Sequence, residues 1–355
     1  MRVAVVGAGL AGAALAWRLT RRGAQVEIFA PRGPYGQDAT NASGGLVRGF
    51  EPDPLDARRA AWSLAELRAD PVLRAWAGYR ELPSVYALPP DADPGAAQRA
   101  VDAVDELIPG SARLRQITGP AELPALPGLA VGTLAVQERY AGYISPGRLR
   151  SALLAAALAG GARLLPEPVT GVDPAPAVRV AGGAEHRCDA LVVATGPWTP
   201  PLLARWGLPG QGLRTRQIQY TLGRAEPPGL GAFVDDSSGL YGRVVGAGLL
   251  LLGLPTRHWQ VVPGGIAVDT ALAREVVVRA GERLGLVDWP GAHARTVASA
   301  DCYAGEGGLR LRRLLPDTAV HTFTGGSGGA AKTVLTAAHD AAAELCPRAA
   351  RGTRA

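Results

Sequence analysis

Residues 3–33 read VAVVGAGLAGAALAWRLTRRGAQVEIFAPRG. An apolar run over 3–6 leads into a glycine-rich turn, an Ala/Leu-rich segment with helical spacing follows, and a second apolar run spans 26–29. Strand, glycine turn, helix and strand in this order are typical of the first unit of a dinucleotide-binding fold. We therefore expect the turn to bind a nucleotide rather than to be a plain connection. The residues of this turn that we predict to bind the cofactor are Gly7, Gly9, Leu10, Ala11 and Gly12.

Each glycine of this turn has a physical task. Gly7 permits the tight turn, Gly9 lets the backbone approach a pyrophosphate, and Gly12 lets the helix pack close to the strand. The N-terminus of the helix adds N–H donors and a partial positive charge, both of which favour a phosphate.

The acid that usually binds the adenosine ribose is missing from this fingerprint. Alternation along the second strand puts its place at Ala30, whereas Glu27 is three residues too early and points to the other face of the strand. Arg32 is the nearest polar residue beyond the strand. Either another segment holds the ribose, or the phosphates and other contacts carry the affinity.

Length and composition favour a two-domain enzyme of the α/β class. The chain has 355 residues, of which 47% are hydrophobic and 19% charged. Gly and Arg interrupt every apolar stretch, so we expect no membrane span, and the N-terminus begins directly in a strand pattern rather than in a signal peptide. Cys188, Cys302 and Cys346 lie far apart, with neither metal-ligand spacing nor a disulfide framework. We expect no metal site, and a cytoplasmic location.

The basic residues are informative in two ways. The net charge is +6, but the arginines are scattered and not interleaved with aromatic residues, which argues against nucleic acid as a partner. Lys332 is the only lysine among 37 basic residues. A lone lysine just beyond a glycine loop suggests a site that an arginine cannot serve, because an ammonium is compact and tunable. The alternative is a lysine kept by chance on a helix surface.

Two further segments end strands at positions where open α/β sheets bind ligands. The apolar run 190–194 leads into Thr195-Gly196 and Trp198, and the run 319–324 enters a glycine loop before a helix over 330–345. Short strand patterns with short turns between 213 and 286 indicate antiparallel pairing. We therefore expect a discontinuous nucleotide-binding domain of 1–80, 143–212 and 290–355, and a substrate domain of 81–142 and 213–289.

These segments together resemble the D-amino-acid oxidase superfamily of FAD-dependent enzymes, in particular the glycine oxidase and monomeric sarcosine oxidase group. The resemblance covers most of the chain and is most specific at 3–33 and in the C-terminal segment. It implies a Rossmann-type FAD-binding domain with an inserted antiparallel β-rich substrate domain. The other segments that carry it are the loop Ala42-Ser43-Gly44-Gly45, Gly142-Tyr143 with Pro146, and Ala194-Thr195-Gly196.

The resemblance also implies roles for individual residues. Cys302 is placed like a cysteine that tethers the flavin, although a small buried thiol is the plain alternative. Lys332 is placed like a lysine that pairs with the substrate carboxylate, and Leu251 stands where the sarcosine oxidases carry an oxygen-activating lysine. FAD, rather than NAD, is the cofactor expected to span both chain ends. The remaining implied contacts to it are Arg32, Ser43, Gly44, Thr195, Gly196, Trp198, Gly325, Gly326, Ser327, Gly328 and Gly329.

The function that this resemblance implies is oxidation of the C–N bond of an amine or amino acid, with hydride passing to flavin N5. Lys332, helped by Arg48 or Arg310, would anchor a carboxylate of a small-molecule substrate, and O2 or another acceptor would take the electrons. Tyr241, Tyr303 and Trp198 are candidates to wall the pocket.

Two other function classes fit the same residues. One is a flavoprotein tailoring enzyme that acts on a larger biosynthetic intermediate or on a modified tRNA base. The other is a non-catalytic nucleotide-binding subunit.

Overall fold

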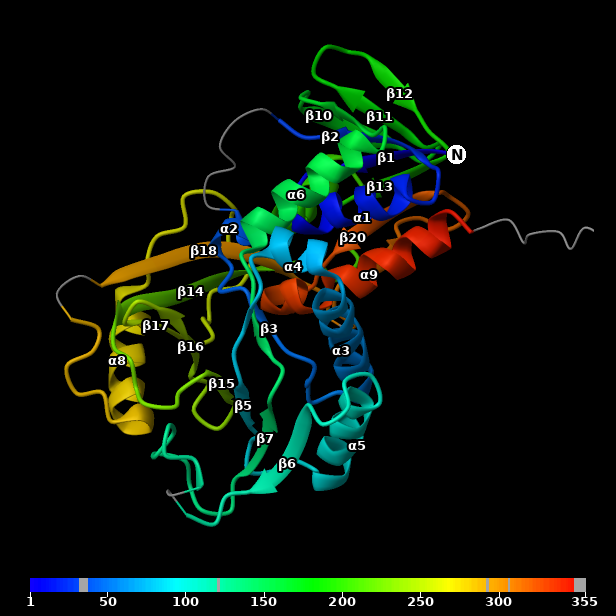
Figure 1. The fold of residues 1–355 in the computed structure, drawn as a ribbon. Helices are drawn as coiled ribbons and strands as arrows, with labels where there is room; N and C mark the ends of the chain where they lie inside the picture. The colour runs from blue at the N-terminus through cyan, green and yellow to red at the C-terminus, as the bar shows by residue number, and fades with distance from the viewer. Residues whose placement is uncertain (32–37, 120–121, 292–293, 306, 348–355) are drawn as a thin grey trace, which may run out of the picture. The chain divides into compact units, whose positions relative to one another are not determined.

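The structure, a computed structural model, describes residues 1–31, 38–119, 122–291, 294–305 and 307–347. The chain divides into two compact units, both drawn in Figure 1. Unit 1 consists of residues 1–36, 146–215 and 301–355, and unit 2 consists of 37–145 and 216–300.

Unit 1 is built on a six-stranded sheet in the order β19-β20-β13-β1-β2-β9. Strands β1, β2, β9, β13 and β20 run parallel, and β19 pairs with β20 in the antiparallel sense. The central strand β1 is buried from its second residue onward, as expected for a parallel sheet covered on both faces. The strands are β1 Arg2–Val6, β2 Gln25–Phe29, β9 Arg163–Leu165, β13 Ala190–Val193, β19 Arg310–Arg313 and β20 Val320–Thr324.

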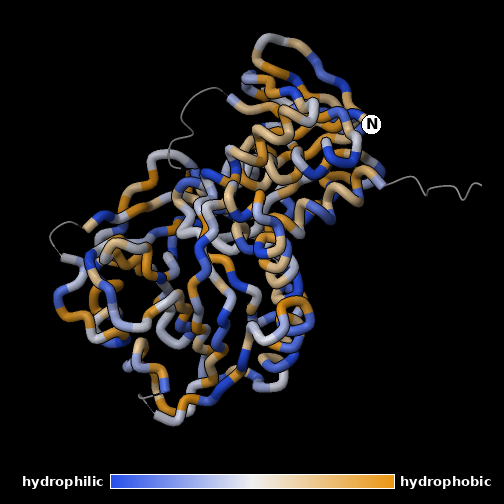
Figure 2. The backbone as a smooth tube through the Cα atoms, in the orientation of Figure 1, coloured by the Kyte–Doolittle hydropathy of each residue, from blue (hydrophilic) through white to orange (hydrophobic). Residues whose placement is uncertain are grey.

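Helix α1 (Leu10–Thr20) packs against α6 (Pro146–Ala159) and α9 (Ala330–Leu345). Its residues Ala13, Ala14 and Ala16 are fully buried, because small side chains let neighbouring helices and strands approach closely. Figure 2 shows how frequent apolar residues are along α1. The other elements of unit 1 are β10 Val169–Asp173, β11 Ala177–Val180, β12 Glu185–Arg187, η2 Gly196–Trp198, α7 Thr199–Arg205 and η3 Ser327–Gly329.

Unit 2 contains an eight-stranded sheet in the order β18-β14-β17-β16-β15-β5-β7-β6. The recorded pairs are antiparallel except for β15 with β5, which run parallel. The strands are β5 Ser84–Ala87, β6 Ala112–Gln116, β7 Leu134–Glu138, β14 Arg214–Arg224, β15 Ala232–Asp235, β16 Tyr241–Gly246, β17 Leu249–Gly253 and β18 Arg295–Tyr303.

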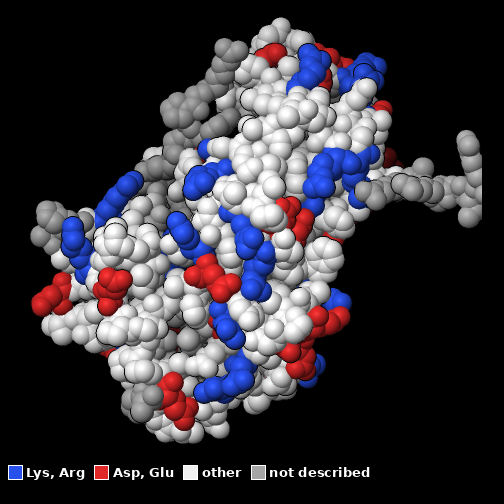
Figure 3. Space-filling view, in the orientation of Figure 1, with Lys and Arg blue, Asp and Glu red and all other residues white. Residues whose placement is uncertain are grey.

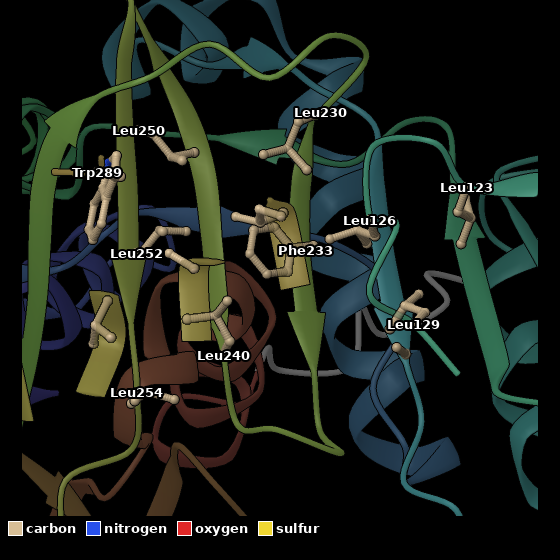
Figure 4. Packing of buried hydrophobic residues seen from close by; sticks show 14 of the residues in the cluster. Leu123, Leu126, Leu129, Leu230, Phe233, Leu240, Leu250, Leu252, Leu254 and Trp289 are labelled. Atoms are coloured by element: carbon tan, nitrogen blue, oxygen red, sulfur yellow. The ribbon is translucent and has the colours of Figure 1, made fainter. Parts of the chain in front are cut away.

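The two faces of this sheet differ in chemistry, because successive side chains of a strand point to opposite sides. On one face Phe233, Leu250 and Leu252 form a buried cluster with Trp289 and with helix α8 (Thr270–Leu284), as Figure 4 shows. The opposite face presents tyrosines and an arginine, which are described with the site below.

A second, three-stranded sheet in the order β3-β8-β4 completes unit 2 together with four helices. Sequence analysis placed 37–80 with the nucleotide-binding domain, whereas these residues lie in unit 2. The reason is pairing and packing within unit 2: α3 packs on α5, and both β3 and β4 pair with β8. The elements are α2 Ala39–Ala42, β3 Leu46–Val47, α3 Pro54–Ala69, α4 Pro71–Ala77, β4 Arg80–Glu81, α5 Pro94–Asp105 and β8 Gly142–Tyr143.

Over the described ranges, no helix has the length and apolar character that a membrane crossing requires. The same residues contain no group of three or more His, Cys, Asp and Glu side chains arranged to hold a metal ion.

Candidate active site

The carboxyl ends of β1, β2 and β13 meet at one edge of the unit 1 sheet. The Gly7 amide donates to the Phe29 carbonyl at 2.8 Å, and the Ala194 amide donates to the Val6 carbonyl at 2.7 Å. Strand β1 therefore has β2 on one side and β13 on the other. At β1 the sheet stops growing in one direction and continues in the other, which makes it a topological switch point. Open α/β sheets bind their ligands in the crevice at such a switch point.

Two glycines of the first turn are required by close contacts. Gly7 has φ +112°, and a Cβ there would lie 2.5 Å from the Ala194 carbonyl oxygen. A Cβ on Gly12 would lie 2.0 Å from the Gly7 carbonyl oxygen, so helix α1 could not stay as close to the end of β1. The geometry confirms the turn and packing tasks that the sequence predicts for Gly7 and Gly12.

Helix starts in this protein differ in a way that matters for an anion. The helices α2, α3, α4, α5 and α8 of unit 2 are each capped by an aspartate side chain. Helices α1 and α9 begin after Gly9 and Gly329, with no side-chain cap and no acid in the first turn among the described residues. A carboxylate at either start would repel a phosphate or a reduced flavin, and both starts lack one.

The end of β13 continues this edge of the sheet. The Thr195 and Thr199 hydroxyl groups lie 2.9 Å apart, and Gly196 has φ +55° with no protein atom within 4 Å of the Cβ position. The side chain of Trp198 is half-buried at the end of the short helix η2. The strand end therefore presents a small, open backbone segment, as a bound cofactor would need.

The C-terminal glycine loop has a packed part and an open part. A Cβ on Gly325 would lie 2.9 Å from the Ala304 Cβ, and one on Gly326 would lie 2.9 Å from the Cβ atoms of two neighbours. At Gly328 a Cβ would meet nothing within 4 Å. The loop is tied to the end of β18 by a bridge between Tyr303 and Gly326, so the predicted wall residue Tyr303 does lie beside it.

Lys332 lies in the first turn of α9, and its side chain folds back over the loop. The Cβ position of Gly329 is 3.5 Å from the Lys332 Nζ and 3.8 Å from the Ser327 Oγ, so an ammonium and a hydroxyl converge there. Ser327 itself has φ +53°, a conformation that costs a non-glycine residue about 1 kcal/mol. The structure thus places the only lysine at the glycine loop, half-buried rather than on an open helix surface.

Cys302 lies in the hydrophobic core of unit 1, with 1% of its surface exposed. Burial raises the pKa of its thiol to about 11, against a hydrogen bond to Thr324 that lowers it. The preceding Asp301 accepts a hydrogen bond from the Cys302 amide, and burial raises its pKa to about 7. These surroundings keep the thiol protonated at neutral pH, and a thiol is a poor nucleophile.

The described residues at the end of β2 offer no side chain to bind the adenosine ribose. Ala30 is 3% exposed, and Glu27 forms an ion pair with Arg163 at 3.1 Å. Glu27 is therefore occupied on the other face of the strand, as its position in the sequence predicts. Arg32 lies outside the described residues.

In unit 2 the polar face of the large sheet carries a buried cation. Arg243 of β16 is 8% exposed; its Nε donates to the Gly44 carbonyl at 2.8 Å, and its guanidinium lies over the Tyr143 ring at 4.0 Å. The predicted flavin-contacting loop of Ser43 and Gly44 is thereby fixed to the sheet. Leu251 lies directly across from Arg243 in the register and contacts the Cβ position of Gly44 at 3.5 Å.

Tyr241, predicted to wall the substrate pocket, lies on the same face, two residues before Arg243. Its hydroxyl donates to the Gln219 carbonyl at 3.1 Å, and its ring covers Gly253, where a Cβ would lie 2.5 Å from the ring. The register places Tyr220 on the other side of Gly253, so the two tyrosines flank the same glycine.

Two other predicted cations have different surroundings. Arg48 is 5% exposed, forms an ion pair with Glu51 at 3.1 Å and lies over the Tyr86 ring at 4.8 Å. Its charge is therefore balanced within unit 2. Arg310 is exposed on the edge strand β19, opposite Thr324.

Sequence reasoning gave no site role to Arg243, Tyr143 or Tyr220, although Tyr143 belongs to a segment that carries the resemblance. A signal for the first was available, because Tyr241 and Arg243 share the period-two spacing of one strand face. An arginine within a run that otherwise reads as a buried strand is unusual, since charged residues are rarely buried without a partner. In a chain with 36 arginines among 37 basic residues, that signal is easily lost.

The parallel sheet, the glycine turn at the switch point and the uncapped start of α1 define a dinucleotide-binding protein. A model of the FAD dependent oxidoreductase family matches residues 2–343. The chain belongs to this family and is an FAD-dependent oxidoreductase. No curated protein matches the chain.

Solved structures agree with this fold over nearly the whole chain. L-proline dehydrogenase from P. horikoshii gives a TM-score of 0.79 at 17% identity, covering 99% of this chain and 94% of that one. Glycine oxidase from Geobacillus kaustophilus gives 0.76 at 22% identity, covering 99% and 96%. Iminodiacetate oxidase from Chelativorans sp. BNC1 gives 0.68 at 22% identity, covering 99% and 96%. At these identities the likeness shows the fold alone.

The residues of unit 1 fit FAD. Gly7 and Gly12 leave no space for a Cβ, Gly196 and Gly328 open onto empty space, and both flanking helices start without a carboxylate. When bound, FAD supplies a two-electron acceptor for the substrate.

Proposed function

We propose that this protein oxidises the C–N bond of an amine or amino acid, with FAD held by unit 1 and hydride accepted at flavin N5. One observation carries the proposal. Three segments at the carboxyl edge of the unit 1 sheet, which we call the cradle, have open or closely approaching backbone and no carboxylate at the helix starts: the first turn (7–12), the end of β13 (194–196) and the glycine loop before α9 (325–329). Three structural neighbours are named for enzymes of amino or imino acids, which supports an amine substrate.

In this reaction the chain's own residues have to hold the substrate with its amine neutral, supply positive charge at the glycine loop and line the substrate pocket. The amine must be neutral to lose a hydride, so the site has to hold the substrate without protonating its nitrogen. Lys332, folded over Gly329, supplies a positive charge at the glycine loop, where a carboxylate or the reduced cofactor would carry negative charge. The ring of Tyr241 would line the substrate pocket. Arg48, which forms an ion pair with Glu51, stays a predicted second cation for binding the substrate's carboxylate.

Lys332 offers a direct test. A cation at a helix start is disfavoured by the helix dipole by about 0.3–1 kcal/mol, so the stability of α9 does not account for Lys332 and a role in the reaction is tested instead. We expect Lys332→Met and Lys332→Arg to slow reduction of the bound flavin. Met removes the charge, and Arg replaces the compact ammonium with a larger, planar guanidinium. Wild-type reduction rates and unchanged apparent affinity in both variants would mean that Lys332 has no part in the reaction.

The function itself is tested by a substrate screen. Purified protein is loaded with FAD, and amines and amino acids are added without oxygen while the visible absorbance of the flavin is followed. We expect bleaching by at least one carboxylate-bearing amine. The proposal fails if the protein takes up no FAD. It also fails if the bound flavin is bleached only by substrates without a C–N bond.

A second candidate is a tailoring enzyme that acts on a larger biosynthetic intermediate. One neighbour, NikD, is described as an unusual amino acid oxidase essential for nikkomycin biosynthesis, with a TM-score of 0.74 at 19% identity. A tRNA substrate is less well supported, since Lys and Arg on the face in Figure 3 are interspersed with acidic residues. Bleaching by bulky amino acids but not by small ones would favour the tailoring function.

The electron acceptor and the compartment are also proposals. Leu251 is apolar and lies opposite Arg243, so O2 or another acceptor has no lysine at that place. Mixing reduced enzyme with O2 measures whether reoxidation is fast enough for an oxidase. The three cysteines are free, which supports a reducing cytoplasm.

A further inference from the structure

Asp301 lies where β18 meets the glycine loop of unit 1. The last three residues of this strand belong to that unit, and the chain runs on beside the loop. Tyr303 forms a bridge with Gly326, and the Ala304 amide donates to the Gly325 carbonyl at 3.3 Å. Because β20 runs parallel to β13 and β1 and ends at the loop, this end of β18 lies at the carboxyl edge of the sheet, which also carries the first turn.

The side chain of Asp301 leaves the strand on the face away from the core. Successive side chains of a strand point to opposite faces. Cys302 lies in the hydrophobic core of unit 1 and is bonded to Thr324, so Asp301 and Tyr303 lie on the other face of the strand. Both of these side chains are half-buried. The carboxyl group therefore belongs to the edge where the sheet binds ligands and not to the core below it.

Asp301 has no counter-charge within the described residues. The only hydrogen bond that it accepts there comes from the neighbouring Cys302 amide at 2.8 Å. Two buried acids of unit 2 are better compensated, since Glu138 accepts from two backbone amides and Asp235 pairs with Arg283 at 3.0 Å. Burial raises the pKa of Asp301 to about 7, and only the hydrogen bond to its neighbour opposes this rise. The group therefore gains or loses a proton near neutral pH.

The elements beside Asp301 bring cations and no second acid. Arg310 and Arg312 lie on β19 and Lys332 lies in the first turn of α9, and in the part of the chain that the structure describes none of them pairs with Asp301. Strand β20 carries a single titratable side chain, His321, which is buried. Asp301 is thus the acid at this edge whose ionisation an added negative charge would shift.

Hydride transfer adds negative charge to the cofactor, because FAD accepts two electrons from the substrate when it is bound. A negative charge nearby raises the pKa of a carboxyl group, since like charges disfavour the ionised form. An aspartate with an ordinary pKa, such as those that cap the helices of unit 2, would stay charged and repel the reduced cofactor. A carboxyl group that titrates near neutral pH instead responds by binding a proton.

We propose that Asp301 is the proton acceptor that balances the charge of the reduced cofactor in unit 1. As hydride passes from the substrate to the flavin, the Asp301 carboxylate takes one proton from solvent and becomes a neutral acid. When the electrons leave for the acceptor, the acid returns this proton. The inference rests on the FAD cradle of the proposed function and deepens it, but it does not depend on which substrate delivers the hydride.

The test measures the reduction potential of the FAD-loaded protein against pH, with dithionite and reference dyes, so that no amine substrate is needed. The wild type is compared with Asp301→Asn, whose amide cannot titrate. At about pH 6 the carboxyl group is protonated in both oxidation states, and the two potentials should agree. Toward about pH 9 the potential of the wild type should fall below that of the variant. If reduction raises the proton affinity of Asp301 tenfold, the difference reaches about 30 mV, the value of a tenfold change for a two-electron couple.

Asp340→Asn removes the same charge at an exposed position of α9 and is the matched control, which should follow the wild type at every pH. Asp301→Glu keeps a carboxyl group and should restore the steeper pH dependence. Asp301→Ser takes the place of Asp301→Asn if the latter does not retain FAD. As a second measurement, photoreduction in weakly buffered solution with a pH indicator should show more protons taken up per flavin by the wild type than by Asp301→Asn near pH 8.

Parallel potential curves with equal proton uptake in the wild type and the neutral variant would overturn the proposal. A wild-type protein that takes up no FAD would overturn it together with the proposed function. The expected potential curves in a protein that no amine bleaches would instead overturn the proposed function alone and leave the role of Asp301 standing.

Discussion

At the scale of single residues, the glycines of unit 1 separate into two kinds. A Cβ on Gly12 would lie 2.0 Å from a backbone oxygen, and one on Gly326 would lie 2.9 Å from two side chains. At Gly182 and Gly328 a Cβ would meet nothing within 4 Å. The first kind is required by packing inside the protein. Gly328 lies in the glycine loop before α9, where we propose that a ligand uses the open space, whereas Gly182 lies in the turn between β11 and β12.

We predict that Gly12→Ala lowers the free energy of unfolding of the FAD-free protein by about 1–3 kcal/mol, because the methyl group pushes helix α1 away from Gly7. FAD affinity should fall as well. Gly182→Ala is the control and should stay within about 0.5 kcal/mol of the wild type. Denaturant unfolding and FAD titration measure both effects. Equal stability of the two variants would mean that the close approach of α1 to β1 is not needed.

Cys302 is the sequence's candidate for a covalent flavin bond, and its surroundings work against that chemistry. A thiol with a pKa of about 11 is almost entirely protonated at neutral pH. We therefore expect acid precipitation of the FAD-loaded protein to leave the flavin in the supernatant. If flavin stays with the pellet, Cys302→Ser must release it, while Cys188→Ser and Cys346→Ser must not.

At the scale of the element, strands β16 and β17 place a large ring over a glycine. The Tyr241 ring covers Gly253, where a Cβ would lie 2.5 Å from it. This pairing lets the tyrosine lie flat across β17, with its hydroxyl donating to the Gln219 carbonyl of β14 on the far side. The position of the ring thus depends on the glycine across from it.

We predict that Gly253→Ala costs about 1–3 kcal/mol of stability in the wild type, because Tyr241 has to move. In a Tyr241→Ala background the same change should cost less, since the obstacle is gone. A double-mutant cycle on the free energy of unfolding measures the coupling, expected at about 1 kcal/mol or more. Additive effects would contradict the contact.

Strand β20 carries a buried histidine. His321 is 5% exposed and its Nδ1 has no hydrogen-bond partner in the described structure. Burial lowers its pKa, and Arg313 lowers it further, against Glu344. Below about pH 6.5 the unfolded chain then binds a proton that the folded chain does not, so stability falls as the pH falls.

We predict that the wild type loses up to about 1.4 kcal/mol of stability per pH unit from this group below pH 6.5. His321→Leu should remove this part of the slope. Asp301, with a raised pKa of about 7, acts in the opposite direction between pH 4 and 7 and is unchanged in both proteins. The difference between the two unfolding curves therefore isolates His321, and parallel curves would contradict the prediction.

At the scale of the whole molecule, the sequence predicts the parallel sheet, the first turn and the glycine loop well, because their signals are local. The strand pattern, the glycines and the helix spacing of 3–33 lie side by side in the chain. The buried position of Arg243 was not predictable in this way. Its burial depends on strand pairing with β17 and on a contact with Gly44, about 200 residues away. The membership of 37–80 in unit 2 rests on similar long-range pairing with β8.

We predict that FAD raises the melting temperature of the whole chain, because it binds the folded cradle and not the unfolded chain. At a concentration 100 times its Kd, the ligand adds about 2.7 kcal/mol of stability. Differential scanning fluorimetry with FAD, with NAD and with no ligand measures the shift. Gly9→Val should abolish it, because a side chain there occupies the place of the pyrophosphate. A shift with NAD equal to that with FAD would contradict the predicted choice of cofactor.

Unit 1 is assembled from three stretches of chain, and this has a consequence for synthesis. Strand β20 and helix α9 come from the last fifty residues, yet β20 pairs with β13 inside the sheet. A nascent chain that has emerged only to residue 300 has the first turn but lacks the glycine loop. Synthesis must therefore pass residue 345 before the glycine loop and α9 can complete the cradle, and a product terminated at residue 300 should bind no FAD and be colourless.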